Sequence, residues 1–122
     1  MSDIITSKEV RILKYNYENG KLTIYLEEEL DISSCKIIRG VIDGYIMKYQ
    51  PYELVLDLSG VKFMDSSGIG LIIGRYNLIK LLDSKMKVIN ASDNIKRIIE
   101  LSNIKLECVQ YEWELYKNRV KI

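Results

Sequence analysis

The sequence predicts an α/β domain with a mixed β-sheet that opens with a β-hairpin, and with helices packed mainly on one face. Two observations lead to this fold class. An Asn-Gly pair at residues 19–20 joins two stretches that alternate between apolar and polar residues, which is typical of a hairpin. Helix-like and strand-like segments then alternate along the rest of the chain, which is typical of a sheet whose strands are joined by helices.

The length and composition indicate one domain. The chain has 122 residues, of which 48% are apolar and 29% are charged, as in a globular protein rather than a disordered one. We expect the domain to occupy residues 10–110, after a polar lead-in at 1–9 and before a tail or short helix at 111–122.

The net charge and hydropathy of the chain limit the classes of partner that it is expected to bind. A net charge of +1 gives no electrostatic argument for binding nucleic acid or an anionic membrane directly. The apolar runs are far shorter than a membrane span, and the first eight residues are polar rather than typical of a signal peptide. We therefore expect a cytoplasmic protein.

The first elements are the hairpin and a helix. We expect strands at 11–17 and 21–27, with Leu22, Ile24 and Leu26 on one face. Asp31, Ser33 and Ser34 are each suited to cap the helix that follows. One face of this helix is apolar: Ile37, Ile38, Val41, Ile42, Tyr45 and Ile46. Gly40 and Gly44 lie inside it, and we interpret them as sites of close packing on the sheet.

A central strand and a second helix come next. Residues 54–58 are apolar apart from Asp57, which predicts a strand that is buried on both faces. The second helix is expected from Leu71 to Leu82, after a polar loop. A strand at 86–89, a third helix around 95–101 with a cap at Ser92 or Asp93, and an edge strand at 106–109 complete the order.

Several chemistries are excluded by residues that the chain lacks. It has no histidine, which rules out Ser-His-Asp catalysis, Cys-His catalysis and histidine-based metal sites. Gly68, Gly70 and Gly74 do not precede the Lys-Ser/Thr pair of a phosphate-binding P-loop, and their spacing fits a dinucleotide fingerprint poorly. Cys35 and Cys108 belong to no CxxC motif and are expected to be ordinary thiols. We predict no enzymatic activity, catalytic residue, metal or cofactor.

The chain carries two candidate types of phosphoacceptor. Asp65, Ser66 and Ser67 can cap the second helix, whose positive N-terminal end also favours a phosphate on a serine there. Simple capping is the alternative role for Ser66. Asp57 is the other candidate, as the acceptor of a receiver-like signalling domain, but an opening hairpin does not suit the all-parallel receiver sheet. A strand-end carboxylate that bonds nearby backbone explains Asp57 more simply.

The segment from Phe63 to Tyr76, FMDSSGIGLIIGRY, resembles the signature of anti-sigma factor antagonists, the bacterial branch of the STAS domain family, and of its sporulation members in particular. The likeness runs from about residue 11 to 110 and is densest from 54 to 104. Leu30-Asp31 is similar to the family's Gly-x-Leu-Asp segment, with Glu28 in the place of the glycine. The resemblance implies a single STAS-type domain.

The resemblance also implies a modification site. Ser66, directly after Asp65, corresponds to the serine that an anti-sigma factor serine kinase phosphorylates with ATP and that a serine phosphatase resets. Asp65, Ser67, Gly68 and Asp31 would then support the acceptor loop, with Ser67 as the neighbouring cap.

The implied function is partner switching. The unmodified chain would bind the anti-sigma factor and release the sigma factor, and phosphorylation would block that binding. Docking is expected to use the loop, residues near Asp31 and the exposed side of the second helix, with Arg75, Tyr76 and Asn77. Ordinary solvated surface is the alternative for each of these residues, and for Tyr76 the alternative is a place in the core or at its edge. The family serves sporulation and stress-response circuits; the Gly74-Arg75-Tyr76 match favours sporulation, and a stress-response module with a different partner stays open.

Overall fold

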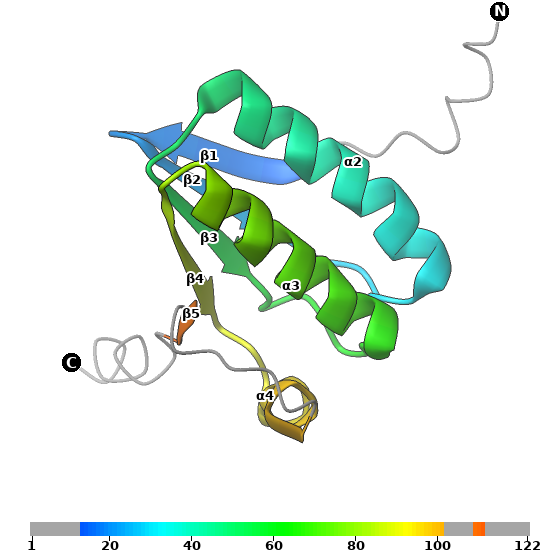
Figure 1. The fold of residues 1–122 in the computed structure, drawn as a ribbon. Coiled ribbons are helices and arrows are strands. Elements are labelled where there is room, and N and C mark those ends of the chain that lie inside the picture. Colours follow the sequence, from blue (N-terminus) through cyan, green and yellow to red (C-terminus); the bar gives the residue numbers. More distant parts are fainter. Residues whose placement is uncertain (1–12, 102–108, 112–122) are drawn as a thin grey trace, which may run out of the picture.

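The computed structural model describes residues 13–101 and 109–111 (Figure 1). In chain order the elements are β1 (Lys14–Glu18), β2 (Lys21–Tyr25), α2 (Ile32–Tyr49), β3 (Glu53–Asp57), α3 (Ser66–Leu81), β4 (Lys85–Ile89), α4 (Asp93–Leu101) and β5 (Val109–Tyr111). The predicted order is confirmed over these residues. The lead-in at 1–9, residues 106–108 of the predicted edge strand with Cys108, and the tail beyond Tyr111 lie outside the described residues.

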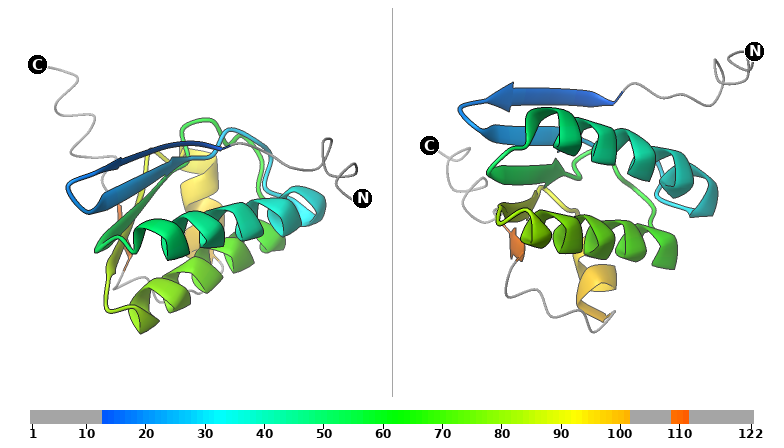
Figure 2. Two further views of the ribbon diagram at one scale, coloured as in Figure 1. Left: turned by 90° about the horizontal axis from the view of Figure 1, so that it is seen from above. Right: turned by 45° about the horizontal axis from the view of Figure 1, so that its top comes forward.

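The strands form one mixed sheet in the order β1-β2-β3-β4-β5. β1 and β2 are antiparallel, and all later neighbours are parallel. Helices α2 and α3 lie side by side on one face of the sheet (Figures 1 and 2). Helix α4 lies beyond the end of β4 and is seen nearly end-on in Figure 1. The predicted mixed sheet, with a hairpin at its start and helices mainly on one face, is confirmed.

The hairpin turn has the geometry that its sequence predicts. Asn19 and Gly20 have φ angles of 52° and 78°, both in the left-handed region that a type I′ turn requires. The turn sets the register so that Leu22, Ile24 and Leu26 are all buried on the core side of the sheet.

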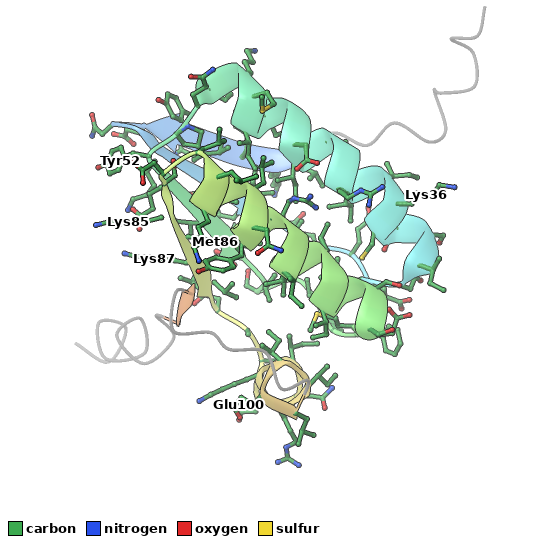
Figure 3. All side chains as sticks on the ribbon, in the orientation of Figure 1. Lys36, Tyr52, Lys85, Met86, Lys87 and Glu100 are labelled. Atoms are coloured by element: carbon green, nitrogen blue, oxygen red, sulfur yellow. The ribbon has the colours of Figure 1, made fainter. Side chains whose placement is uncertain are left out.

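The core lies between the sheet and the two long helices. All five residues of β3 are buried, as expected for the central strand. In β4, Met86 points toward α3 while Lys85 and Lys87 point the opposite way, as the alternation of a strand requires (Figure 3). From α2, the buried residues Cys35, Ile38, Ile42 and Ile46 close the core.

Two details of the helices differ from the sequence prediction. A Cβ at Gly40 or Gly44 would have no atom within 4 Å, so the expected close packing of these glycines is wrong. They are exposed because the buried series of α2 lies on the opposite side of the helix. The second helix begins at Ser66 rather than Leu71, since an aspartate cap starts it earlier.

Candidate functional site

The N-terminal ends of α2 and α3 are joined by a short piece of parallel pairing. Leu30 and Met64 form an isolated β-bridge. The Leu30 N–H donates to the carbonyl of Phe63 at 2.9 Å, and the Asp65 N–H donates to the carbonyl of Leu30 at 3.1 Å. Asp31 and Asp65, which are both predicted to support the acceptor loop, directly follow the bridged residues. The loops before the two helices therefore form one structural unit.

Asp65 is the N-cap of α3. Its backbone is extended, and its Oδ1 accepts a hydrogen bond of 2.7 Å from the backbone N–H of Ser67. The prediction that Ser67 caps the helix is therefore wrong: Ser67 is the second residue of α3 and donates its N–H to the cap. Ser66 is the first helical residue, and its side chain is exposed at the helix end that favours a phosphate.

Asp31 caps α2 through a capping box. Its Oδ1 accepts from the Ser34 N–H at 2.9 Å and from the Ser33 hydroxyl at 3.2 Å, while its own N–H donates to the Ser34 hydroxyl oxygen at 3.1 Å. The bond from the Ser34 N–H is the main cause of a lowered pKa for the Asp31 carboxyl. The unit therefore carries a fixed negative charge at Asp31.

The lowered pKa of Asp31 predicts an acid-dependent contribution to stability. A carboxyl whose folded pKa lies below its ordinary value of 3.8 stabilises the fold above that value. That contribution is lost as the pH falls through the folded pKa. We expect Asp31→Asn to show a smaller loss of stability between about pH 5 and pH 2 than the parent, measured by urea unfolding across that range. An unchanged acid dependence would contradict this assignment.

Gly68 lets the first turn of α3 pack against the β-bridge. A Cβ at this position would lie 2.2 Å from Cγ of Met64 and 3.0 Å from Cβ of Leu30, and both of those side chains are buried. By contrast, a Cβ at Gly74 on the same helix would meet no atom within 4 Å. The loop-support role predicted for Gly68 thus has a steric basis.

This contrast makes a matched pair of variants. We expect Gly68→Ala to lower the free energy of unfolding by about 1–3 kcal/mol, since the added methyl overpacks the bridge. Gly74→Ala should instead raise it by up to about 1 kcal/mol, through helix propensity alone. Urea unfolding monitored by circular dichroism measures both changes. Equal effects of the two substitutions would show that the bridge tolerates the methyl group.

Two large apolar side chains near Ser66 are exposed, and the sequence reasoning missed them. Ile32, in the first turn of α2, is 73% exposed, and Phe63, just before the bridge, is 48% exposed. Apolar periodicity does not identify them, because an apolar residue at the start of a helix or just before one is usually interpreted as part of the core. They make the surface beside Ser66 suited to contact a protein partner.

A groove of about 440 Å³ separates the N-terminal halves of α2 and α3. Its lining residues are Ile32, Cys35, Lys36, Arg39, Ser67, Gly70 and Leu71. Figure 3 shows Lys36 projecting from α2. Burial raises the pKa of the Cys35 thiol, so the thiol stays protonated and unreactive, as expected for an ordinary cysteine. The groove thus combines an apolar floor with the cations of Lys36 and Arg39.

Arg75 does not lie on the exposed side of α3, and that part of the docking prediction is wrong. Its side chain is 7% exposed, and its Nε lies 2.8 Å from Oδ1 of Asp43 on α2. The N–H is not aimed well enough at this oxygen for a hydrogen bond, so the contact is an ion pair. Tyr76 is half-buried, with the Lys80 ammonium 5.8 Å from its ring centre, and Asn77 is exposed. The ion pair between Arg75 and Asp43 therefore connects α3 to α2.

Asp57 has the simpler of its two predicted roles, that of a strand-end carboxylate that bonds nearby backbone. It is 7% exposed, its Oδ1 accepts from the Ser59 N–H at 2.9 Å, and its Oδ2 accepts from the Asn90 amide at 3.2 Å. Both oxygens are engaged, and the antiparallel β1–β2 pair differs from an all-parallel receiver sheet.

The part of the chain that the structure describes contains no group of three or more Cys, Asp or Glu side chains able to hold a metal ion.

Within residues 13–101 and 109–111, no helix is both long enough and apolar enough to cross a membrane.

Comparison with known proteins identifies relatives over most of the chain. Residues 13–119 match the family model described as the STAS domain. The anti-sigma F factor antagonist of Paenibacillus polymyxa is 33% identical over 92 residues, which cover 75% of this chain and 79% of the relative. The anti-sigma-B factor antagonist of Bacillus subtilis is 24% identical over 84 residues, which cover 69% and 75% of the two chains.

Solved structures share the fold. The unphosphorylated form of the anti-sigma factor antagonist SpoIIAA superposes with a TM-score of 0.66 at 21% identity, covering 90% of this chain and 98% of that protein. The phosphorylated form of the Bacillus protein SpoIIAA superposes with a TM-score of 0.65 at 22% identity, covering 89% and 99%. At these identities the likeness concerns the fold alone.

Proposed function

The chain belongs to the STAS domain family, and on this premise we propose that it is an anti-sigma factor antagonist whose binding is switched by phosphorylation of Ser66. The antagonist role is supported by the names of its curated relatives. The single observation that carries the switch is the position of Ser66, an exposed hydroxyl on the first residue of α3, directly after the cap Asp65.

In the unmodified state, the anti-sigma factor covers the surface around Ser66. The exposed side chains of Phe63 and Ile32 supply apolar contact area, and Asn77 lies further along α3. Asp31 supplies a fixed charge at the edge of this surface. Arg75 takes part only indirectly, because it is buried against Asp43 and holds α2 against α3.

Phosphorylation is proposed to weaken this contact by a local change of charge. The kinase transfers the γ-phosphoryl group of ATP to the Ser66 hydroxyl oxygen, ADP leaves, and a phosphatase later hydrolyses the new bond. The phosphate adds about −1.5 to −2 charge beside the carboxylates of Asp65 and Asp31. Docking would have to strip water from this cluster of like charge, which opposes binding.

The domain itself can accommodate the phosphate without refolding. The N-terminal end of α3 favours negative charge, and the cations of Lys36 and Arg39 border the adjoining groove. The switch therefore requires no rearrangement of the sheet or of the two helices.

The proposal is tested by release of a sigma factor. Adding the unmodified chain to a preformed complex of sigma factor and anti-sigma kinase should free the sigma factor, as measured by native mass spectrometry. Ser66→Asp should bind the kinase about tenfold more weakly, because it places a carboxylate in the interface. Asn94→Asp, which adds the same charge at an exposed position on α4 outside the proposed surface, is the matched control and should have the smaller effect.

The partner class is tested in the same assay. Relatives include antagonists in both the sigma F and the sigma B systems, so both types of anti-sigma factor should be offered. The higher identity to the sigma F antagonist predicts tighter binding to a kinase of that type. Failure to bind either type, or unaltered binding by Ser66→Asp, would contradict the proposed switch.

A further inference from the structure

β1 forms an open edge of the sheet. It is the outermost strand, and β2 is its only ladder neighbour within the described part of the chain (Figure 2). All five of its residues are exposed, it contains no proline, and its register with β2 runs without a bulge. Such a regular strand offers unpaired backbone groups to another strand.

The hairpin turn determines which backbone groups face outward. A two-residue turn closes on a hydrogen-bonded pair, which here is Glu18 with Lys21. Hydrogen-bonded and non-hydrogen-bonded pairs alternate in an antiparallel ladder, so Asn16 and Lys14 also bond inward to β2. The N–H and C=O groups of Tyr15 and Tyr17 therefore point away from β2, toward the open edge.

The sequence of β1, Lys-Tyr-Asn-Tyr-Glu, is self-complementary when it is read in opposite directions. We propose that β1 pairs with β1 of a second copy of this chain, antiparallel, about a two-fold axis at Asn16. In this register Tyr15 lies opposite Tyr17 of the second copy, and both have outward-facing backbone groups. The two such pairs use all four of the outward donors and acceptors of each strand's tyrosines.

The same register matches charge. Lys14 lies opposite Glu18 of the second copy, in a non-hydrogen-bonded pair where side chains approach most closely. Within one chain, Lys14 already lies 3.6 Å from the Glu27 carboxylate, and Glu18 lies opposite Lys21. Pairing would therefore extend an alternating row of charges: Lys21, Glu18, then Lys14 and Glu27 of the second copy.

The aromatic face of β1 is held in place before any pairing. Tyr15 lies 4.3 Å from Tyr45 and Tyr17 lies 4.5 Å from Tyr49, measured between ring centres. The hydroxyls of Tyr15 and Tyr49 are 2.8 Å apart and hydrogen-bonded. Because these rings are already ordered, pairing would cost little side-chain entropy and would place tyrosines of the two copies side by side. Ser66 takes no part in this contact, so the proposed pairing of β1 does not depend on the proposed function.

Charge exchange tests the proposed pairing in the full-length protein. Sedimentation equilibrium should show a monomer–dimer equilibrium. Lys14→Glu or Glu18→Lys should each raise its dissociation constant about tenfold or more, since each creates two like-charge pairs across the axis. The double variant Lys14→Glu with Glu18→Lys exchanges the charges and should recover part of the lost dimerisation; recovery is incomplete because Glu27 and Lys21 of the same chain then face like charges. A strictly monomeric parent, or a double variant no better than the single ones, would overturn the proposal.

Cross-linking tests the register. Residues on the two-fold axis in a non-hydrogen-bonded pair have Cα atoms about 4.5 Å apart, within disulfide range. Mild oxidation of Asn16→Cys should therefore give a covalent dimer, with a disulfide between the two substituted positions found by mass spectrometry, whereas Thr23→Cys on β2 should not. A dimer that forms equally with Thr23→Cys, or that does not form with Asn16→Cys, would contradict the proposed register. Pairing of β1 with another segment or with another protein would contradict the proposal that its partner is a second copy.

Discussion

Replacing Ser66 by alanine should reduce phosphorylation by the anti-sigma kinase about a hundredfold or more, whereas Ser67→Ala should leave most of it. Ser66 presents an exposed hydroxyl on the first residue of α3. Ser67 is half-buried and lines the groove between α2 and α3. Phosphoryl transfer depends on positioning, and displacement of a reacting atom by about 1 Å can cost about a hundredfold. The neighbouring hydroxyl is therefore a poor substitute.

The assay incubates each variant with the kinase and ATP and locates the added phosphate by mass spectrometry. Both serines lie after the cap, and the Asp65 carboxylate accepts from the Ser67 backbone rather than from a side chain. Neither alanine variant should therefore disturb the cap, and circular dichroism should show both folded. Phosphate mapped to Ser67 in the parent would reverse the assignment of the acceptor.

The sequence predicts most of the fold because its signals are local. The Asn19-Gly20 turn, the alternating apolar residues of β2 and the buried run of β3 each depend on neighbours along the chain, and the structure confirms all of them. The identity of the cap was harder to predict. Asp65 and Ser67 both have suitable side chains, and only the extended backbone at Asp65 decides between them.

Contacts between distant residues could not be predicted in this way. An arginine on a helix is usually interpreted as solvent-facing, and nothing near Arg75 in the sequence indicates that Asp43, on another helix, will pair with it. The exposure of Phe63 has the same origin. Its carbonyl is fixed by the bridge to Leu30, a contact between two loops, and its side chain is left at the surface.

Removing the partner of Arg75 should strongly destabilise the domain. The guanidinium is 7% exposed, and its Nη1 has no hydrogen-bond partner within the described part of the chain. Asp43→Ala would leave this charge buried and unpaired. Such losses cost about 3–5 kcal/mol for fully buried pairs. Because the Asp43 side chain is 36% exposed, we expect a smaller loss of about 2–3 kcal/mol in the free energy of unfolding.

Arg75→Met provides the matched comparison, because it removes the buried charge and keeps a long apolar side chain between the helices. Asp43 can then be hydrated, so this variant should be less destabilising than Asp43→Ala, and adding Asp43→Ala to it should cost little more. Urea unfolding of the two single variants and the double variant measures this coupling. If Arg75→Met were the more damaging single change, Arg75 would stabilise the helix pair mainly by packing rather than through its ion pair. The comparison therefore decides whether charge or volume holds α2 against α3 beside the groove that adjoins Ser66.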